Sequence, residues 1–248
     1  MFSAIFTSTI KRRDVALLMC FSILPLLPPF LMGNQDFETM SKSDFTSSLL
    51  SFMSGALDTQ YKLIIPTLIM GFIVSSVFRD EIDTGIIFLY KDIKRKDIFN
   101  LKLKSLCLVY IGYFILSLLA SVWAYYGLVV PKWQLNPSLF PKDLLSVEQG
   151  ILSVLSTVLL NTITIYVVSL VSIKYKTLVA VLSGVLLTLL AMIAPMLSFM
   201  KYVFPNGYLD LRDENTFLVS LFSILGLSLA YLSVTYLLAK HRFENIEF

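Results

Sequence analysis

The sequence predicts an all-α membrane protein with six transmembrane helices. Hydrophobic residues make up 56% of the 248 residues and charged residues only 15%, whereas an average soluble chain has about 25% charged residues. Six continuous apolar runs are long enough, or nearly so, to cross the roughly 30 Å hydrocarbon layer as helices. Because these runs do not alternate polar and apolar residues, they do not resemble barrel strands. We therefore expect a single transmembrane domain over residues 1–248.

The apolar runs give the approximate limits of the spans. They lie at 15–32, 62–78, 105–130, 147–172, 177–200 and 216–239. The second run is the shortest and needs flanking residues to cross the bilayer, whereas the third and fourth are long enough to tilt. Three basic residues precede the first run, as in a signal peptide. However, the run contains three prolines and lacks small residues at a cleavage spacing, so we expect a retained helix.

The placement of Lys and Arg predicts that both termini are cytoplasmic. With the N-terminus inside, segments 1–14, 79–104, 173–176 and 240–248 carry 14 of the 20 Lys and Arg residues, and the outer segments carry the other 6. Cytoplasmic loops of membrane proteins generally carry such an excess of positive charge. We therefore expect a multi-pass protein of a bacterial cell membrane.

Two further segments have amphipathic patterns. Residues 1–10 alternate apolar and small polar residues, which fits either a short helix along the membrane surface or a partly ordered tail. The outer loop 33–61 has apolar residues at helical spacing and predicts a short amphipathic helix on the outer surface. Those residues are Phe45, Leu49, Leu50, Phe52 and Met53.

The sequence offers no residues for catalysis or metal binding. The spans hold no ionisable side chain clearly at mid-membrane depth, where ion-coupled transporters and pumps keep the groups that bind the driving ion. The chain has one histidine, His241, and two cysteines, Cys20 and Cys107, which is too few for a disulfide framework and argues against a thiolate metal site. We expect no catalytic residue, no bound metal and no enzymatic activity of this chain.

The fourth run contains neutral polar residues, among them Thr157, Asn161 and Thr164. Such residues commonly form hydrogen bonds between helices in a membrane. The alternative is a weakly polar path for a transported substrate. Asn161 is the most costly of them to expose to lipid, so we expect it to face another helix.

The connection between the second and third spans, 79–104, is the most informative segment. It is dense in charges of both signs and keeps apolar residues at 86, 87, 89, 93, 98 and 101. This pattern favours short amphipathic helices at the cytoplasmic surface, which could present one face to a partner. The alternative is a solvated basic loop that only fixes the topology.

This connection resembles that of the type-2 ABC exporter permeases, which have six helices and a conserved cytoplasmic segment after the second. The residues that match the motif of that family are Glu81, Gly85, Leu89, Arg95 and Lys102. The chain departs from the motif at Ile86, which replaces a small polar residue. It also lacks the usual proline, and its Gly-to-Arg stretch is about two residues shorter. The resemblance covers the whole chain in architecture but only some 25 residues in motif.

The resemblance implies a coupling helix that docks on a separate ATP-binding subunit. The residues implied in this contact are Glu81, Gly85, Leu89, Ile93, Arg95 and Lys102. It further implies short re-entrant helices around Pro195 and 205–208, although a plain turn would equally explain these prolines. This chain would bind no cofactor, because it has no Gly-x-x-x-x-Gly-Lys-Ser/Thr loop, and ATP and Mg²⁺ would bind the partner subunit.

The expected partners are a cytoplasmic ABC ATPase, a second permease subunit and the lipid bilayer, with no nucleic acid. An apolar path suits hydrophobic or amphipathic substrates, and permeases of this kind export peptides or protect the cell against them. A non-transporting membrane scaffold or sensor subunit is the alternative function.

Overall fold

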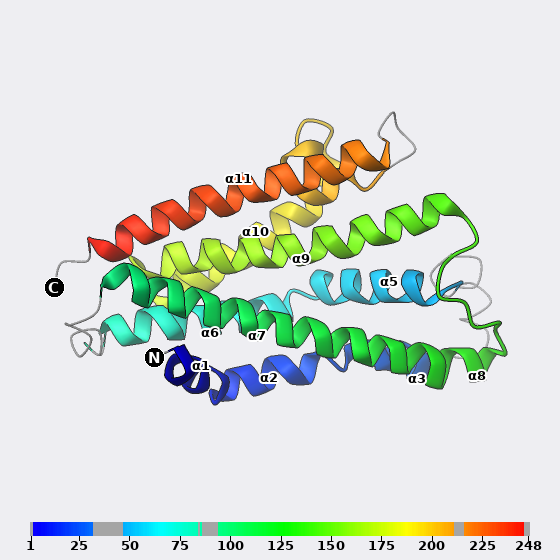
Figure 1. Ribbon diagram of the computed structural model, residues 1–248, viewed down its shortest axis with the longest axis horizontal. Coiled ribbons are helices and arrows are strands. Elements are labelled where there is room, and N and C mark those ends of the chain that lie inside the picture. Colours follow the sequence, from blue (N-terminus) through cyan, green and yellow to red (C-terminus); the bar gives the residue numbers. More distant parts are fainter. Residues whose placement is uncertain (1, 32–46, 84, 86–93, 211–215, 246–248) are drawn as a thin grey trace.

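A computed structural model describes residues 2–31, 47–83, 85, 94–210 and 216–245 of the chain. Within these ranges every regular element is a helix, and no strand occurs. The long helices run roughly along the longest axis of the molecule (Figure 1). The predicted all-α class is therefore confirmed.

Among the described residues, five helical segments are long and apolar enough to cross a membrane, and a bent pair of helices makes a sixth if the pair is counted as one span. These lengths and compositions indicate a multi-pass membrane protein. The five are α2 (Arg13–Phe21) with η1 (Leu24–Leu26) and α3 (Leu27–Leu31); α7 (Arg95–Ala124) with the π-helix η4 (Tyr125–Val129) and α8 (Val130–Trp133); α9 (Leu144–Ser172); α10 (Thr177–Ile193) with η5 (Ala194–Met196); and α11 (Phe217–Glu244).

The bent pair consists of α5 (Leu49–Lys62) and α6 (Ile65–Asp83), whose axes differ by 63°. Pro66 explains why one straight helix does not pass through this point, since it has no N–H to donate to the Lys62 carbonyl. Ile64, between the two helices, has a φ of 61°, a left-handed conformation that is rare for a β-branched residue. The predicted second span, 62–78, thus begins at a break rather than at the end of a loop.

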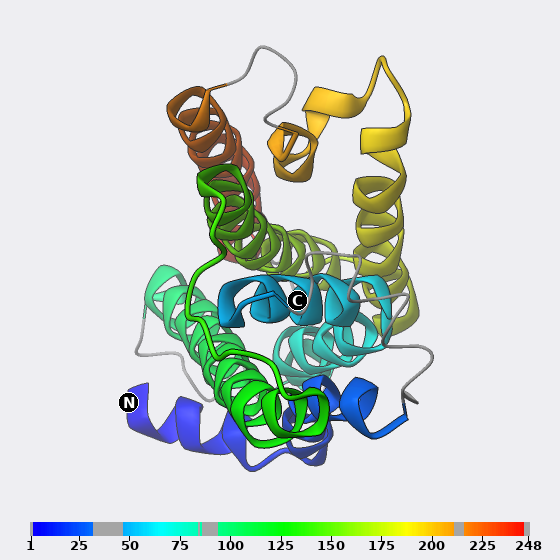
Figure 2. The ribbon, with the colours of Figure 1, turned by 90° about the vertical axis from the view of Figure 1, so that its right-hand side faces the viewer.

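The predicted helix in the 33–61 loop exists as α5, but its expected place on the outer surface is wrong. Phe52, Ala56, Leu57 and Tyr61 are buried on one face of α5, which packs against α9. Figure 2 shows α5 between the other long helices. The apolar face of this amphipathic helix therefore contacts protein.

The first span is broken by its prolines. Pro25 lacks an N–H, so the Phe21 carbonyl loses the donor that a regular helix would provide four residues later. The Gln60 side chain of α5 replaces that donor, with its Nε2 3.3 Å from the Phe21 oxygen. The break in the first span and the position of α5 therefore depend on each other.

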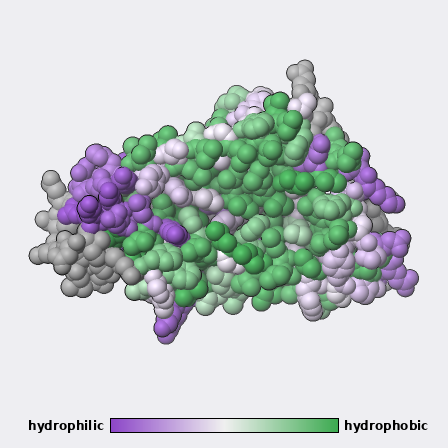
Figure 3. All heavy atoms as spheres, in the orientation of Figure 1, coloured by the Kyte–Doolittle hydropathy of each residue, from purple (hydrophilic) through white to green (hydrophobic). Residues whose placement is uncertain are grey.

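The helices alternate in direction, which brings α1 (Phe2–Ile10), the end of α6, the start of α7, the α9–α10 turn and the end of α11 to one end of the molecule (Figure 1). We call it the basic end. Hydrophilic side chains gather at both ends of the molecule, with a hydrophobic belt between them (Figure 3). The described basic residues of the basic end are Lys11, Arg12, Arg13, Arg79, Lys94, Arg95, Lys96, Lys102, Lys104, Lys174, Lys176, Lys240 and Arg242.

Helix α1 agrees with the first of the two alternatives for residues 1–10, a short helix. It is seen nearly end-on in Figure 1 and lies across the lower edge of the molecule in Figure 2. It contacts the first turns of α7, where the Lys104 ammonium lies 5.2 Å from the centre of the Phe2 ring. The N-terminal helix thus lies across the basic end of the bundle, against α7.

Candidate functional site: an ion-paired junction at the basic end

Three phenylalanine rings hold the helices together at the basic end. Phe78 comes from α6, Phe99 from α7 and Phe243 from α11, and each is at most 1% exposed. The Phe78 and Phe99 ring centres are 5.6 Å apart, and the Phe243 centre lies 5.6 Å from Phe99 and 6.1 Å from Phe78. Aromatic pairs at such separations attract one another beyond the effect of their burial. The rings therefore form a rigid base for the polar groups beside them.

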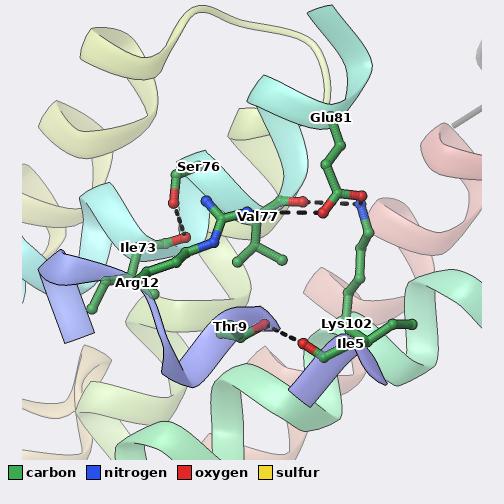
Figure 4. A network of polar contacts seen from close by, with 8 residues as sticks. All are labelled: Ile5, Thr9, Arg12, Ile73, Ser76, Val77, Glu81 and Lys102. Carbon is green, nitrogen blue, oxygen red and sulfur yellow. Dashed lines mark hydrogen bonds and ion pairs between the residues drawn. The ribbon is translucent and has the colours of Figure 1, made fainter. Parts of the chain in front are cut away.

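Lys102 enters this base from α7 and is only 1% exposed. Its ammonium donates to the Val77 carbonyl at 2.9 Å and lies 2.7 Å from Glu81 Oε2, both on α6 (Figure 4). It also lies 5.5 Å from the centre of the Phe78 ring and 6.0 Å from that of Phe243. A buried cation needs such partners, because water no longer solvates it.

Glu81 is shared between two cations. Its Oε1 lies 3.9 Å from Arg12 Nη2 at the start of α2, while Oε2 faces Lys102 (Figure 4). Helix α1 lies next to the Glu81–Lys102 pair. Within α1, the Thr9 hydroxyl donates to the Ile5 carbonyl. Beneath α1 lies a hollow of about 130 Å³, lined by Ala4, Ile5, Ser8, Thr9, Glu81, Ile98 and Lys102. A carboxylate on α6 thus links the first and third spans.

Two further hydrogen bonds attach α11 to α7. Arg95 Nη1 donates to the Glu244 carbonyl at 2.9 Å, and the Tyr236 hydroxyl lies 2.9 Å from Asn100 Oδ1. The first satisfies a carbonyl in the last turn of α11, which has no donor within its own helix. The start of α7 is therefore joined to α6, α2 and α11 at once.

Gly85 ends α6. Its φ is 70°, and its N–H donates to the Ile82 carbonyl at 3.2 Å. A glycine in this left-handed conformation two residues after Asp83 is a common way for a helix to stop. The glycine of the motif thus has a structural role, because its left-handed conformation ends the helix.

The structure therefore gives different places to the residues of the predicted coupling segment. It brings the buried Lys102 together with Glu81, whose side chain is 20% exposed, so the Lys102 ammonium does not face an external partner here. Arg95 is exposed, at the other end of the segment. Leu89 and Ile93 lie outside the described residues, as does most of the segment between α6 and α7.

The expectation of separate surface helices across 79–104 is wrong for both ends of that segment. Residues 79–83 continue α6, and residues 95–104 form the first turns of α7. The apolar residues Ile98, Phe99 and Leu103 are buried in the junction. The sequence did not reveal this burial, because the same spacing of apolar residues is found in a helix that packs on a helix bundle and in one that lies on a membrane surface.

The polar residues expected on the fourth span lie within α9. Thr157 and Thr164 are at most 9% exposed, and the Thr164 hydroxyl donates to the Leu160 carbonyl at 2.9 Å. Asn161 Nδ2 donates to the Thr157 carbonyl at 3.0 Å, and the Asn161 side chain lies close to that of Tyr110 on α7. Asn161 therefore does face another helix, as expected from the cost of exposing it to lipid.

A polar hollow at the end opposite the basic end was not expected from the sequence. It has a volume of about 450 Å³ and lies between α5 and α9. The Asp58 carboxylate and the Lys62 ammonium form an ion pair of 2.6 Å on its wall, with side chains 42% and 58% exposed. Its lining residues are Ser51, Ser54, Gly55, Asp58, Lys62, Ser146, Gln149, Gly150, Ser153 and Leu209. Polar residues on two facing helices at i, i+3, i+4 and i+7 were the signal that could have revealed it.

Short helices follow α10 near the same end. They are η5, η6 (Lys201–Val203) and η7 (Pro205–Tyr208), where a re-entrant structure or a plain turn was expected. Asn206 Nδ2 donates to the Ala191 carbonyl at the end of α10, at 2.6 Å. Gly207 lies directly against the Lys201 carbonyl, where there is no space for a Cβ atom. The segment is thus a compact set of 3₁₀ turns.

Within the described residues, no group of three or more His, Cys, Asp or Glu side chains could hold a metal ion. The chain matches no family model, no curated protein and no solved structure. Its candidate site is therefore defined by geometry: an ion pair between the buried Lys102 and the partly exposed Glu81, at the base of the connection between α6 and α7.

Proposed function

We propose that this chain is the membrane-spanning permease subunit of an ABC exporter. It would move hydrophobic or amphipathic substrates, peptides among them, out of a bacterial cell. A separate cytoplasmic ATP-binding subunit would bind ATP and Mg²⁺ and supply the energy. The basic end would face the cytoplasm, in accord with the positive-inside rule.

The observation that carries this proposal is the Glu81–Lys102 pair. The pair joins α6 to α7 at the base of the connection that would dock on the ATP-binding subunit. Two helices held together by the ion pair of a buried lysine and by aromatic rings move as one body, because parting them would leave the Lys102 ammonium without its carboxylate. A displacement of the connection would then be passed to both spans as a rigid-body movement.

The polar hollow between α5 and α9 supports transport over a passive role. An exposed ion pair such as Asp58–Lys62 is costly beside lipid, so a hollow that contains it is filled with water or with a polar ligand. An open polar hollow at the end opposite the basic end is what an export path would require at its outer end. A second permease subunit beside this one would widen the path for a bulky substrate.

The direct test is transport by the reconstituted complex. The chain and its ATP-binding subunit are placed in liposomes, and a fluorescent amphipathic peptide is followed after addition of ATP. The proposal predicts ATP-dependent movement of the peptide away from the side that holds the ATPase. A scaffold or sensor subunit predicts none, even when the two proteins bind each other stably.

A further inference from the structure

A second hollow at the basic end lies apart from the ion-paired junction. It has a volume of about 390 Å³ and lies where the turn between α9 and α10 meets the last turn of α11. Its lining residues are Ile173, Lys174, His241, Arg242 and Asn245. Hydrophilic side chains gather at this end of α11 in Figure 3. The hollow thus brings basic residues from two distant parts of the sequence together.

Lys174 and Arg242, the two cations of this hollow, have no carboxylate partner in the part of the chain that the structure describes. Among the described residues, neither Lys174 nor Arg242 forms an ion pair, and both side chains are exposed. They follow or end α9 and α11, whose C-termini carry a partial negative charge that favours nearby cations. That effect explains basic residues at each helix end separately. It does not explain why those of two helices line one hollow.

Apolar side chains flank the hollow on the side of the hydrophobic belt. Leu178 lies in the first turn of α10, four residues after Lys174, and Leu237 and Leu238 lie one turn before His241 on α11. Their side chains are 69%, 62% and 47% exposed, respectively. Cations at the level of lipid phosphates, with exposed leucines one turn deeper, provide for both parts of a phospholipid.

We propose that this hollow binds the phosphate group of an anionic phospholipid, with the acyl chains against Leu178, Leu237 and Leu238. Lys174 and Arg242 supply the charge, and the Arg242 guanidinium can donate two hydrogen bonds to one phosphate. The Asn245 amide nitrogen already lies 3.2 Å from His241 Nε2, which places both side chains on the rim of the hollow. This inference does not depend on the proposed export function.

The test is retention of lipid by the purified chain. The wild-type chain in neutral detergent is mixed with equal amounts of phosphatidylglycerol and phosphatidylcholine, and bound lipid is counted by native mass spectrometry. Phosphatidylglycerol should be retained in preference. Each of Lys174→Gln and Arg242→Gln should weaken its binding about fivefold, since a basic residue near a lipid surface contributes about 1 kcal/mol. The double variant should lose about 25-fold by the same estimate.

Two controls make the result specific. Lys142→Gln removes the same charge from an exposed residue at the other end of the molecule and should leave retention unchanged. Inorganic phosphate at millimolar concentration should not displace the lipid, because it lacks the acyl chains. Equal losses in Lys142→Gln and Lys174→Gln, or unchanged binding in the double variant, would overturn the proposal. Full displacement of phosphatidylglycerol by inorganic phosphate would also overturn the proposal. Displacement of the lipid only by an acidic protein partner would overturn it as well.

Discussion

The Lys102 ammonium and the Glu81 carboxylate lie 2.7 Å apart at the base of the connection between α6 and α7. The two residues are 21 positions apart in the sequence, and the distance places the ends of the connection side by side. Lys102 also donates to the Val77 carbonyl, so its position relative to α6 is fixed by two contacts.

Breaking the pair from either side should destabilise the chain. Lys102→Met leaves Glu81 with Arg12 alone, and Glu81→Gln leaves a buried ammonium with a neutral partner. Removing one partner of a buried pair typically costs about 3–5 kcal/mol. We therefore expect a clear loss of stability for each variant, measured as chemical unfolding in detergent. Since Glu81 is partly exposed, its variant should lie at the lower end of that range.

The double variant Lys102→Met and Glu81→Gln separates pairing from packing. It removes the Lys102 charge together with that of its carboxylate partner and leaves only Arg12, which is partly exposed, without that carboxylate. Its loss should therefore be smaller than the sum of the single losses. Additive losses would show that the two residues contribute independently and would contradict the role of the pair as a clamp.

Gly85→Ala should destabilise the end of α6. An L-residue at φ 70° costs about 1–2 kcal/mol. Gly226→Ala in α11 is the matched control, because a Cβ atom there meets nothing within 4 Å and alanine favours a helix interior. Unfolding in detergent should show a loss for Gly85→Ala and none for Gly226→Ala. Equal stability of both variants would mean that the left-handed conformation of Gly85 is not required.

Gln60→Leu should destabilise the contact between α5 and the first span. It leaves the Phe21 carbonyl without a donor in an apolar place, which costs about 1–3 kcal/mol. Pro25→Ala returns an N–H four residues after Phe21, so Gln60→Leu should cost less in that background. This cycle can be measured by thermal unfolding. An identical cost of Gln60→Leu in both backgrounds would refute the link between the proline break and Gln60.

Residues in the polar hollow should be accessible to water from outside the cell. Ser54→Cys and Ser153→Cys are introduced into a chain in which Cys20 and Cys107 are replaced by alanine. A membrane-impermeant thiol reagent added to intact cells should label both. Ser228→Cys on α11, where the native serine is fully buried, is the control and should stay unlabelled. Labelling of Ser54→Cys only after the cells are opened would reverse the proposed orientation.

Much of the fold follows from the sequence because apolar length is a strong signal. An apolar run as long as 177–200 indicates a helix that crosses a membrane or lies in a large core. The structure has α10 and η5 in this range. The class and the approximate limits of five of the six predicted spans were therefore predictable. The bend at Ile64 was not predictable. Pro66 lies inside the apolar run 62–78, and a proline in the first turn of a helix is compatible with one uninterrupted span that begins there.

The sequence predicted two residues of the candidate site, Glu81 and Lys102, but not that they pair with each other. Glu81 and Lys102 were singled out by a resemblance in sequence, but a sequence does not say whether two opposite charges face a partner or each other. That choice depends on the packing of Phe78, Phe99 and Phe243, which come from three helices. The polar hollow depends similarly on which faces of α5 and α9 meet.

The central claim is that a separate ATP-binding subunit acts on the connection between α6 and α7. The most direct measurement is purification of the tagged chain from its own membranes, followed by quantification of any ATP-binding protein and of ATP hydrolysis. We predict one ATP-binding subunit per chain, with hydrolysis that is lost when the phosphate-binding lysine of that subunit is replaced. Arg95→Glu should reduce the recovery of that subunit at least tenfold, and Lys142→Glu should not. A folded chain that carries no ATP-binding protein and no hydrolysis would contradict the account.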